Sequence, residues 1–407
     1  MRPAELVRGL ADFEGRGAGT NAERRAALWL SQDLQNGPRQ TSLETFWCRP
    51  NLALAHAWHA LIGIVGSLLS ISHPEIGGGL LVAALLSVLA DSLTGYSLGR
   101  RLTREHASQN VVNRGAATDG RVRLIITSNY DAGRGGFVYR DLPRRVVATC
   151  RRVAGGGRFT PGWVGWLAIM LIWLVVVAIL RHGGSAGTWI GVLQLIPTVS
   201  LVLELALLLE HGGSEFSPAA GDNASGTGVA LALARALDAA PPRHLQVEVV
   251  LQGAGDGQMI GLTRHLRGRR RELTSTQTIV LGIGPCGAGQ PRWWVGDGSL
   301  IPLRYLARLR RIAASVADPE TGSEARPYRG RGVSPAFPAR MAGLPAISVG
   351  ALDERGLAPR SHQPRDVADA VDPGAMDAVL EFALTLVDAI DADLRISDRS
   401  AARPAAA

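Results

Sequence analysis

Residues Ser217 to Gly226 have the sequence SPAAGDNASG and precede an alanine- and leucine-rich segment from Gly228 to Leu237. Proline and glycine are typical of turns, whereas alanine and leucine favour helix, so this stretch predicts a loop that leads directly into a helix. The Asp-Asn pair in the loop could simply cap the helix N-terminus. It could also present a carboxylate and an amide to a cation or to a substrate amine. The segments on either side bear on this choice.

Short apolar segments with β-branched residues lie on both sides of the loop. The predicted strands are Arg121 to Ser128 (RVRLIITS), Gln246 to Gln252 (QVEVVLQ), Thr278 to Ile283 (TIVLGI) and Pro345 to Val349 (PAISV). The predicted helices are Arg24 to Leu34, Gly228 to Leu237 and Ala375 to Ala392. Strands that alternate with helices predict a layered α/β fold with a largely parallel sheet.

Polar motifs follow these segments in a set order. The segment Gln109-Asn110-Val111-Val112 comes first, and Asn129-Tyr130-Asp131 ends the first strand. Ala254-Gly255-Asp256 follows the second strand, and Ser361-His362-Gln363-Pro364-Arg365-Asp366 comes after Gly343-Leu344-Pro345-Ala346. This succession resembles the zinc metallopeptidase family that includes aminopeptidase Y, bacterial leucyl aminopeptidases, glutamate carboxypeptidase and the transferrin receptor. The resemblance implies a three-layer α/β sandwich with a mixed, mainly parallel sheet.

The resemblance also implies a site with two zinc ions, of which this chain retains part. The bridging aspartate of the family matches Asp222, and the late histidine ligand matches His362. The ligand glutamate falls on Asp256, a shorter carboxylate. The family's early histidine falls on Asn129, and a further aspartate ligand falls on Gly282. The glutamate that acts as general base falls on Gly255.

The surviving residues predict a half-site. Asp222, Asp256 and His362 could hold a single zinc ion, and three ligands with an open position suit a catalytic zinc. Without a base at Gly255, the motif has no group to take the proton of a bound water. Asp131 and Asp366 match acids of the family that orient the histidine ligands. We therefore expect a catalytically silent homologue that holds one zinc or none and acts in binding or scaffolding at the membrane.

Two alternatives stay open. A single-zinc aminopeptidase or amide hydrolase would need a base from elsewhere, for which Glu215 is the candidate. Transport through apolar helices is disfavoured, because Asp91 lies near a helix end and Glu204 is the one acid well inside a predicted span.

Four long apolar stretches interrupt the polar chain, and each could span the roughly 30 Å hydrocarbon layer. They are Leu52 to Ser72, Gly77 to Tyr96, Gly162 to Leu180 and Thr188 to Leu209. We predict two transmembrane hairpins, 52–96 and 161–210, inserted into a discontinuous aminopeptidase-like domain. That domain comprises 1–50, 97–160 and 211–394, with a flexible link from Arg140 to Arg158 and a disordered tail at 395–407.

Arginine placement predicts the orientation. The first 50 residues contain no apolar signal segment, and the turns inside the hairpins carry one arginine, Arg181. The other side of the hairpins carries Arg49, Arg100, Arg101, Arg104, Arg151, Arg152 and Arg158. The positive-inside rule therefore predicts a multi-pass protein of the cell membrane with its polar domain in the cytoplasm.

Composition narrows the set of partners. The 407 residues carry a formal charge of +8 without a single lysine, which together with abundant alanine and glycine is typical of a bacterial GC-rich genome. The basic run from Arg264 to Arg271 is therefore expected to be a solvated helix face or a contact to anionic lipid. Cys48, Cys150 and Cys286 follow no metal or redox spacing. We expect the lipid bilayer and a peptide or protein as partners, and no nucleic acid; the oligomeric state stays open.

Overall fold

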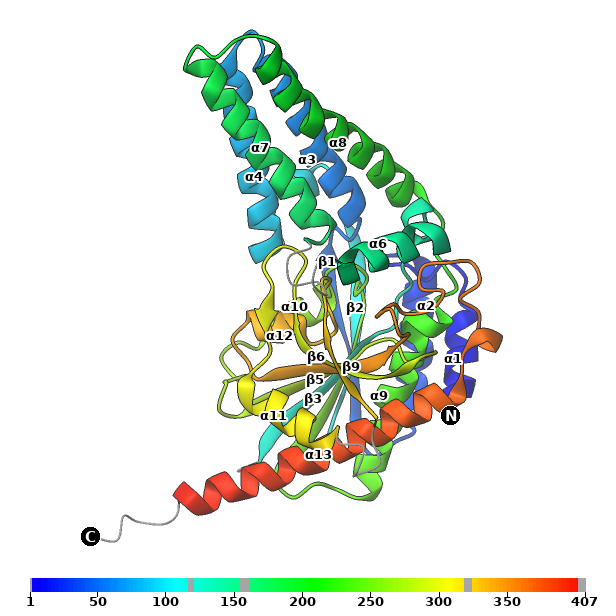
Figure 1. Cartoon of the computed structure of the whole chain (residues 1–407). Helices are drawn as coiled ribbons and strands as arrows, with labels where there is room; N and C mark the ends of the chain where they lie inside the picture. Colours follow the sequence, from blue (N-terminus) through cyan, green and yellow to red (C-terminus); the bar gives the residue numbers. More distant parts are fainter. Residues whose placement is uncertain (1, 116–120, 154–160, 318–323, 402–407) are drawn as a thin grey trace, which may run out of the picture.

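The computed structural model describes residues 2–115, 121–153, 161–317 and 324–401, with side chains up to residue 395. Its polar part is built on a nine-stranded mixed sheet (Figure 1). The strands are β1 (Gln40–Cys48), β2 (His106–Arg114), β3 (Val122–Asn129), β4 (Leu245–Gln252), β5 (Thr278–Ile283), β6 (Gln290–Asp297), β7 (Leu303–Arg304), β8 (Arg326–Arg329) and β9 (Ala346–Leu352). The order is β1-β2-β4-β3-β5-β9-β6-β7, and β8 pairs with β6.

The centre of the sheet is parallel and its margins are antiparallel, apart from β8, which pairs parallel with β6. Strands β4, β3, β5 and β9 run parallel to one another, whereas β1, β2 and β4 pair antiparallel, as do β9, β6 and β7. The four predicted strands are the four central ones. They are buried on both faces and so consist of nearly continuous apolar residues, which is the pattern that marks them in the sequence.

Helices cover both faces of the sheet, as the three-layer prediction requires. One face is covered by α1 (Pro3–Ala11), α2 (Asn21–Gln35), α9 (Ser225–Ala239), α11 (Ala307–Val316) and α13 (Pro373–Ala401). The other is covered by α10 (Ile260–Gly268) and α12 (Phe337–Met341) (Figure 1). Helix α9 lies at the centre because Val229, Leu233 and Leu237 are buried in the larger core. The predicted three-layer α/β sandwich with a mixed, mainly parallel sheet is confirmed.

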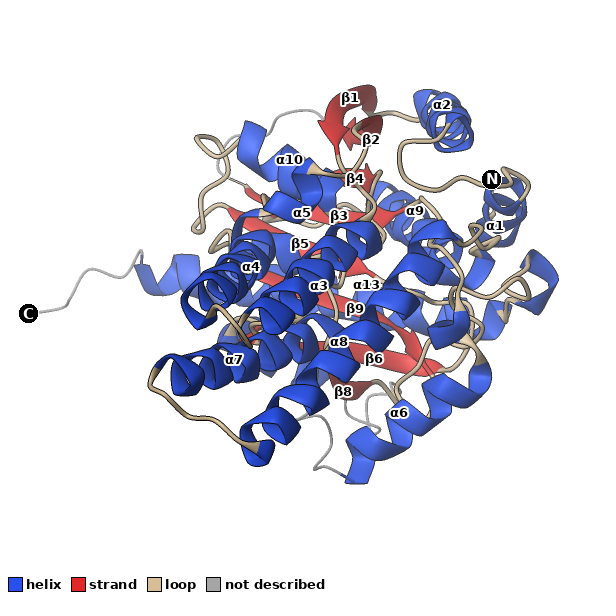
Figure 2. Ribbon diagram, turned by 90° about the horizontal axis from the view of Figure 1, so that it is seen from above, coloured by secondary structure: helices blue, strands red, loops and turns tan. Residues whose placement is uncertain are grey.

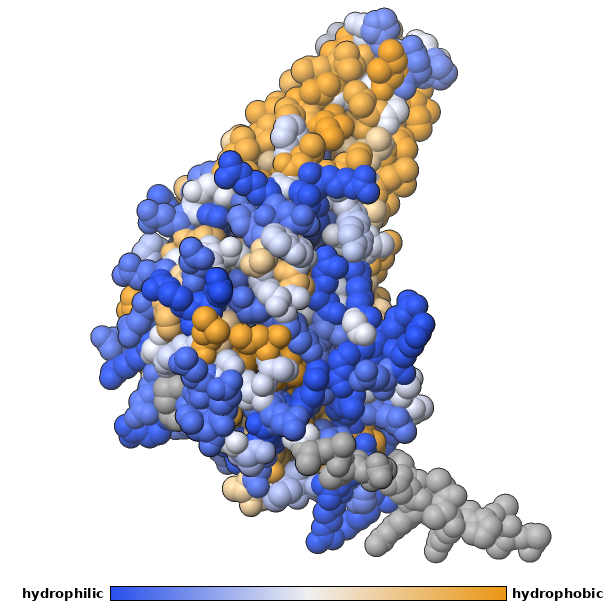
Figure 3. All heavy atoms as spheres, turned by 180° about the vertical axis from the view of Figure 1, so that it is seen from behind, coloured by the Kyte–Doolittle hydropathy of each residue, from blue (hydrophilic) through white to orange (hydrophobic). Residues whose placement is uncertain are grey.

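Four apolar helices rise from one end of this domain (Figure 1). They are α3 (Leu52–Leu69), α4 (Pro74–Thr94), α7 (Trp163–His182) and α8 (Thr188–Gly213), and each is long and apolar enough to cross a membrane. Leu81, Leu171 and Leu201 form a core between them, while residues such as Ile172 and Leu195 remain exposed. The outer face of the bundle is therefore hydrophobic (Figure 3), and an apolar face of this extent is typical of a surface that contacts lipid.

Two segments differ from the prediction. Residues of the expected flexible link form α6 (Asp141–Val153), because Asp141 accepts hydrogen bonds from Gln363 and Arg365, and Arg144 donates to the Ala358 carbonyl. Arg158 lies outside the described residues. Helix α13 continues to Ala401, past residue 395 where the tail is predicted to begin.

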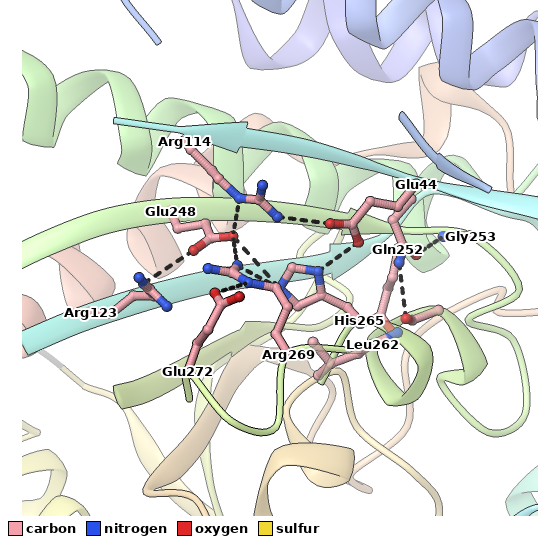
Figure 4. A network of polar contacts seen from close by, with 12 residues as sticks. Glu44, Arg114, Arg123, Glu248, Gln252, Gly253, Leu262, His265, Arg269 and Glu272 are labelled. Atoms are coloured by element: carbon pink, nitrogen blue, oxygen red, sulfur yellow. Dashed lines mark hydrogen bonds and ion pairs between the residues drawn. The ribbon is translucent and has the colours of Figure 1, made fainter. Parts of the chain in front are cut away.

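A polar network binds α10 to the sheet (Figure 4). Glu248 of β4 is buried and lies 2.6 Å from the Arg269 guanidinium and 3.0 Å from that of Arg114. His265 lies 2.7 Å from Glu44 of β1, so β1 is joined to the same network. Arg269 of the basic run therefore has a structural partner inside the fold.

Candidate functional site

The predicted site residues come together where the central strands end. Strand β3 ends at Asn129, and β4 is followed by the loop that carries Asp256. Asp222 precedes α9, and His362 follows β9. The carboxyl edge of the parallel strands is where open α/β sheets form their ligand crevices.

His362 is held with one ring nitrogen towards Asp256. Its Nδ1 lies 2.7 Å from the Arg134 carbonyl oxygen, and its Nε2 lies 3.6 Å from Oδ1 of Asp256. Because a carbonyl can only accept, Nδ1 carries the hydrogen, and in the neutral ring Nε2 keeps its lone pair. The imidazole also stacks on the Tyr139 ring, with centroids 4.0 Å apart. His362 is therefore oriented so that its Nε2 and the Asp256 carboxylate could bind the same metal ion.

Asp222, by contrast, is bound to a hydroxyl. Its Oδ2 accepts a hydrogen bond of 2.5 Å from the Ser361 Oγ. Its backbone N–H donates to Asp366 Oδ2 at 3.0 Å, and the Gly221 N–H donates to the other oxygen at 2.7 Å. Asp366 thus holds the Asp222 loop and does not contact His362, contrary to the role that the resemblance implied.

Asp131 holds the loop that carries Asp256, in the same way as Asp366 holds the loop that carries Asp222. It accepts hydrogen bonds from the backbone N–H groups of Gly255 and Asp256, at 2.9 and 3.0 Å. Burial, together with the charge of Asp256, raises the pKa of Asp131 to about 6. Burial and the charge of Asp222 raise the pKa of Asp366 to about 6 in the same way. Each buried acid therefore positions one of the predicted carboxylate ligands through its main chain.

The degenerate ligand positions are packed against other atoms. The Asn129 amide accepts from Asn223 Nδ2 at 3.0 Å and donates to Asp131 Oδ1 at 3.2 Å. A Cβ at Gly255 would lie 2.2 Å from the Cβ of Asn129, and one at Gly282 would lie 2.5 Å from the Ala336 nitrogen. Real Cβ atoms do not approach other atoms so closely. The space that a base and a second metal ligand would need is therefore filled.

The surviving donors do not converge as a zinc site. Donor atoms about 2.0 Å from a tetrahedral zinc lie about 3.3 Å apart, and the Asp256–His362 spacing is close to this value. Asp222 is instead bound to Ser361. Among the described residues no group of three His, Cys, Asp or Glu side chains is arranged to hold a metal ion. As arranged here, the residues fit two ligands of a zinc ion but not three.

Two aromatic residues at the site were not predicted. The Tyr139 ring lies between two histidines, 4.0 Å from His362 and 5.2 Å from His211. Burial, with the charges of Asp256 and Asp222, raises the pKa of the Tyr139 hydroxyl well above its usual range. The sequence places His211 only at the end of an apolar helix, and Tyr139 only in an arginine-rich segment, so neither carried a signal. The proposed base Glu215 has an exposed side chain, while its carbonyl oxygen accepts from Gly135 at 2.8 Å.

The loops around the site hold strained backbone. In the described part of the chain, the residues other than glycine with positive φ are Ala219, Ala254, Met259, Arg360 and His362. All of them lie in the loops that carry Asp222, Asp256 and His362. Such conformations cost about 1–3 kcal/mol each and persist where the surroundings enforce them, typically at functional sites. The conformation of these three loops is thus fixed by their surroundings.

Comparison with known proteins finds one matching family model and several solved structures of similar fold. Residues 209–387 match the family model described as Peptidase family M28. LapA aminopeptidase of Legionella pneumophila is similar in structure, with a TM-score of 0.51 and 11% identity over 96% of this chain and 71% of that one.

Glutaminyl cyclases also resemble the chain. The enzyme from Porphyromonas gingivalis has a TM-score of 0.51 and 13% identity, and 95% of this chain and 96% of that chain are covered. A leucine aminopeptidase precursor from Bacteroides thetaiotaomicron has a TM-score of 0.51 and 13% identity over 95% of each chain. No curated protein matches the sequence. At these identities the similarity concerns the fold.

Proposed function

We propose that this chain, whose residues 209–387 match the model of peptidase family M28, is a membrane-anchored, non-hydrolytic member of that family that binds a peptide or protein partner. The observation that carries the proposal is the packing of the base and second-metal positions. Asn129 is bonded at both ends of its amide, and the Cβ space at Gly255 and Gly282 is occupied. A base and a second metal ligand cannot be accommodated there without movement of the surrounding chain.

Membrane anchoring is supported by the four apolar helices. Each presents large apolar side chains outward, where water would make them unfavourable, and the surface of the bundle is hydrophobic over its length (Figure 3). The arginines flanking the hairpins favour a cytoplasmic domain.

The partner that suits the site is a peptide with a free amino group. Asp222 and Asp256 are both partly exposed acids at the edge of the sheet, and a carboxylate attracts an ammonium group. The Tyr139 ring forms an aromatic wall beside them. Strained loops keep these groups in place although the residues for hydrolysis are missing.

The alternative function is a single-zinc hydrolase acting on peptides or other amides. It is favoured by one observation, the 3.6 Å spacing of His362 Nε2 and Asp256 Oδ1. Zinc would then require Asp222 to leave the Ser361 hydroxyl and turn towards His362.

The two functions differ in metal content. We expect detergent-purified full-length protein to retain no zinc after dialysis and to release no product from aminoacyl p-nitroanilides above the level of a His362→Ala variant. One zinc per chain, lost in His362→Ala together with measurable hydrolysis, would establish the alternative.

Binding is tested separately. Peptides with a free N-terminus should bind the wild type by calorimetry, and the same peptides after N-acetylation should not. Asp222→Asn should weaken this binding, whereas the exposed Glu354→Gln should not. Equal binding of acetylated and free peptides would contradict the proposal.

A further inference from the structure

A cavity lies at the junction of the helical bundle and the domain. It has a volume of about 580 Å³, within the usual range for ligand pockets. It is formed by the end of α4, by α10 and α12, and by the loop that contains Ser299 and Ile301. Figure 1 shows α10 and α12 below the domain end of α4. Neither Asp222, Asp256 nor His362 lines it, so it is separate from the site described above.

Arginine dominates the charge of this cavity. Its arginines are Arg49, Arg100, Arg101, Arg264, Arg267 and Arg270, and its acids are Asp91 and Glu105. Asp91 forms an ion pair with Arg100 at 2.5 Å, and Glu105 lies 4.0 Å from Arg49. The other arginines have no carboxylate partner among the residues that the structure describes. The cavity therefore carries an uncompensated positive charge.

The arginines of the basic run from Arg264 to Arg271 point in different directions. Arg269 points to Glu248 on the sheet and belongs to the network of Figure 4. Arg264 and Arg267 instead line the cavity. Arg264 donates to the carbonyl oxygen of Trp47 in β1 at 3.1 Å, and Arg267 donates to that of Thr94 in α4 at 2.6 Å. Arg267 also lies over the Tyr96 ring, 5.7 Å from its centroid. Each of these two guanidiniums has further N–H groups that remain available to an anion.

The rim of the cavity is apolar where it meets the bundle. Leu93 in the last turn of α4 and Tyr96 just after it are 52% and 58% exposed, and Ile301, which also lines the cavity, is 39% exposed. An anion without an apolar part would make no favourable contact with such a rim. An amphiphile with an anionic head and acyl chains would place its head among the arginines and its chains along α4.

We infer that this cavity binds the phosphate headgroup of an anionic phospholipid. Guanidinium groups bind phosphate oxygens through paired hydrogen bonds, and basic groups at a membrane surface attract anionic lipid. The inference goes beyond the proposed function and shares with it only the placement of the bundle in a bilayer. It does not depend on whether the family site hydrolyses or binds a substrate.

The test uses full-length protein in a neutral detergent with short-chain dioctanoyl phosphatidylglycerol as the probe. Saturable binding, followed by thermal shift and native mass spectrometry, is expected for this lipid and not for dioctanoyl phosphatidylcholine. The exposed pair Arg267→Ala and Arg270→Ala should weaken binding roughly 25-fold, at roughly fivefold per arginine. Arg311→Ala, an exposed arginine on α11 outside the cavity, is the matched control.

Three results would overturn the inference. Equal affinity for phosphatidylglycerol and phosphatidylcholine would show that the protein does not recognise the headgroup charge. Unchanged affinity in the double variant, relative to Arg311→Ala, would place the lipid elsewhere. Glycerol 3-phosphate or inorganic phosphate binding as tightly as the lipid would identify a soluble phosphate ligand instead. If the double variant does not fold, the single Arg270→Ala variant is used, with a roughly fivefold weakening expected.

Discussion

Asn129 illustrates how a ligand position becomes a structural one. A histidine at this place in the family would point a ring nitrogen at a metal. Here the Asn129 side chain instead joins Asn223 to Asp131, and Asp131 in turn holds the Asp256 loop. The change therefore keeps the loops in place by hydrogen bonds within the chain.

Gly282 gives the most direct test of the filled second-metal position. Gly282→Asp should destabilise the protein by about 1–3 kcal/mol or more, because its Cβ would lie 2.5 Å from the Ala336 nitrogen and its charge would be buried. The variant should also gain no zinc. Thermal unfolding and metal analysis measure both effects.

Gly268→Asp is the matched control. Its Cβ would meet no atom within 4 Å, and the residue is exposed at the end of α10. An acid near a helix C-terminus costs less than about 1 kcal/mol. If Gly282→Asp is tolerated as well as this control, the position is not packed as described.

Glu23 predicts a dependence of stability on pH. Burial and the charge of Asp131 raise the pKa of Glu23 from 4.5 to about 8, although hydrogen bonds from Ala254, Gly19 and Ser108 act in the opposite direction. Between these values the native state holds a proton that the unfolded state has released, so this contribution is complete below pH 4.5 and is lost as the pH rises through 8. Glu23→Gln should show a shallower decline of melting temperature between pH 5 and 8 than the wild type. Parallel curves for the two proteins would contradict the raised pKa.

At the scale of elements, a polar contact joins the bundle to the domain. Asp91 of α4 is buried and pairs with Arg100 of α5 (Leu98–Arg101), whose guanidinium also contacts Gln258 in the loop after Asp256. Gln258 donates in turn to Asp91 at 3.2 Å. The first hairpin is thereby connected to the loop that carries a candidate ligand.

Arg100→Met should destabilise the protein by about 3–5 kcal/mol, because it leaves the Asp91 carboxylate buried without its guanidinium partner, although Gln258 still donates to it. Adding Asp91→Leu should recover much of that loss, since two apolar residues can replace a buried ion pair. Melting temperatures in detergent give the comparison. The exposed neighbour Arg101→Met is the control, and an equal loss in both single variants would argue against the ion pair.

At the scale of the whole molecule, the two hairpins come together as one bundle. Helices α3 and α8 pack together, as do α4 and α7, so each helix of the first hairpin lies beside a helix of the second, far from it in the chain (Figure 2). Both short turns lie at the end of the bundle away from the domain (Figure 1). A bilayer around the bundle would therefore separate the turns from the domain.

This arrangement predicts the labelling of cysteines in intact cells. Cys150 of α6 is exposed, whereas Cys48 and Cys286 are buried. A membrane-impermeant maleimide should label an added Ala186→Cys in the second turn, and should reach Cys150 only after the cells are opened. Labelling of Cys150 in intact cells would place the domain outside.

Local patterns in the sequence determined the apolar helices and the four central strands, whereas the identity of the site residues was implied by the resemblance to a family. These features depend on near neighbours, because a span needs only length and hydrophobicity, and a strand buried on both faces needs only a continuous apolar run. The margins of the sheet were not predicted. Strands β1 and β6 are only partly buried, and β2 is mostly buried but consists largely of polar residues, so the apolar pattern of all three is weak.

Only the tertiary structure decided what the site residues do. The occupied space at Gly255 and Gly282, the hydrogen bonds of Asp366 to the Asp222 loop, and the contact of Asp222 with Ser361 all join residues far apart in the chain. The arginine-lined cavity likewise gathers Arg49, Arg267 and Ile301 from separate segments. Such contacts arise from the packing of distant elements, and no local pattern of residue types encodes them.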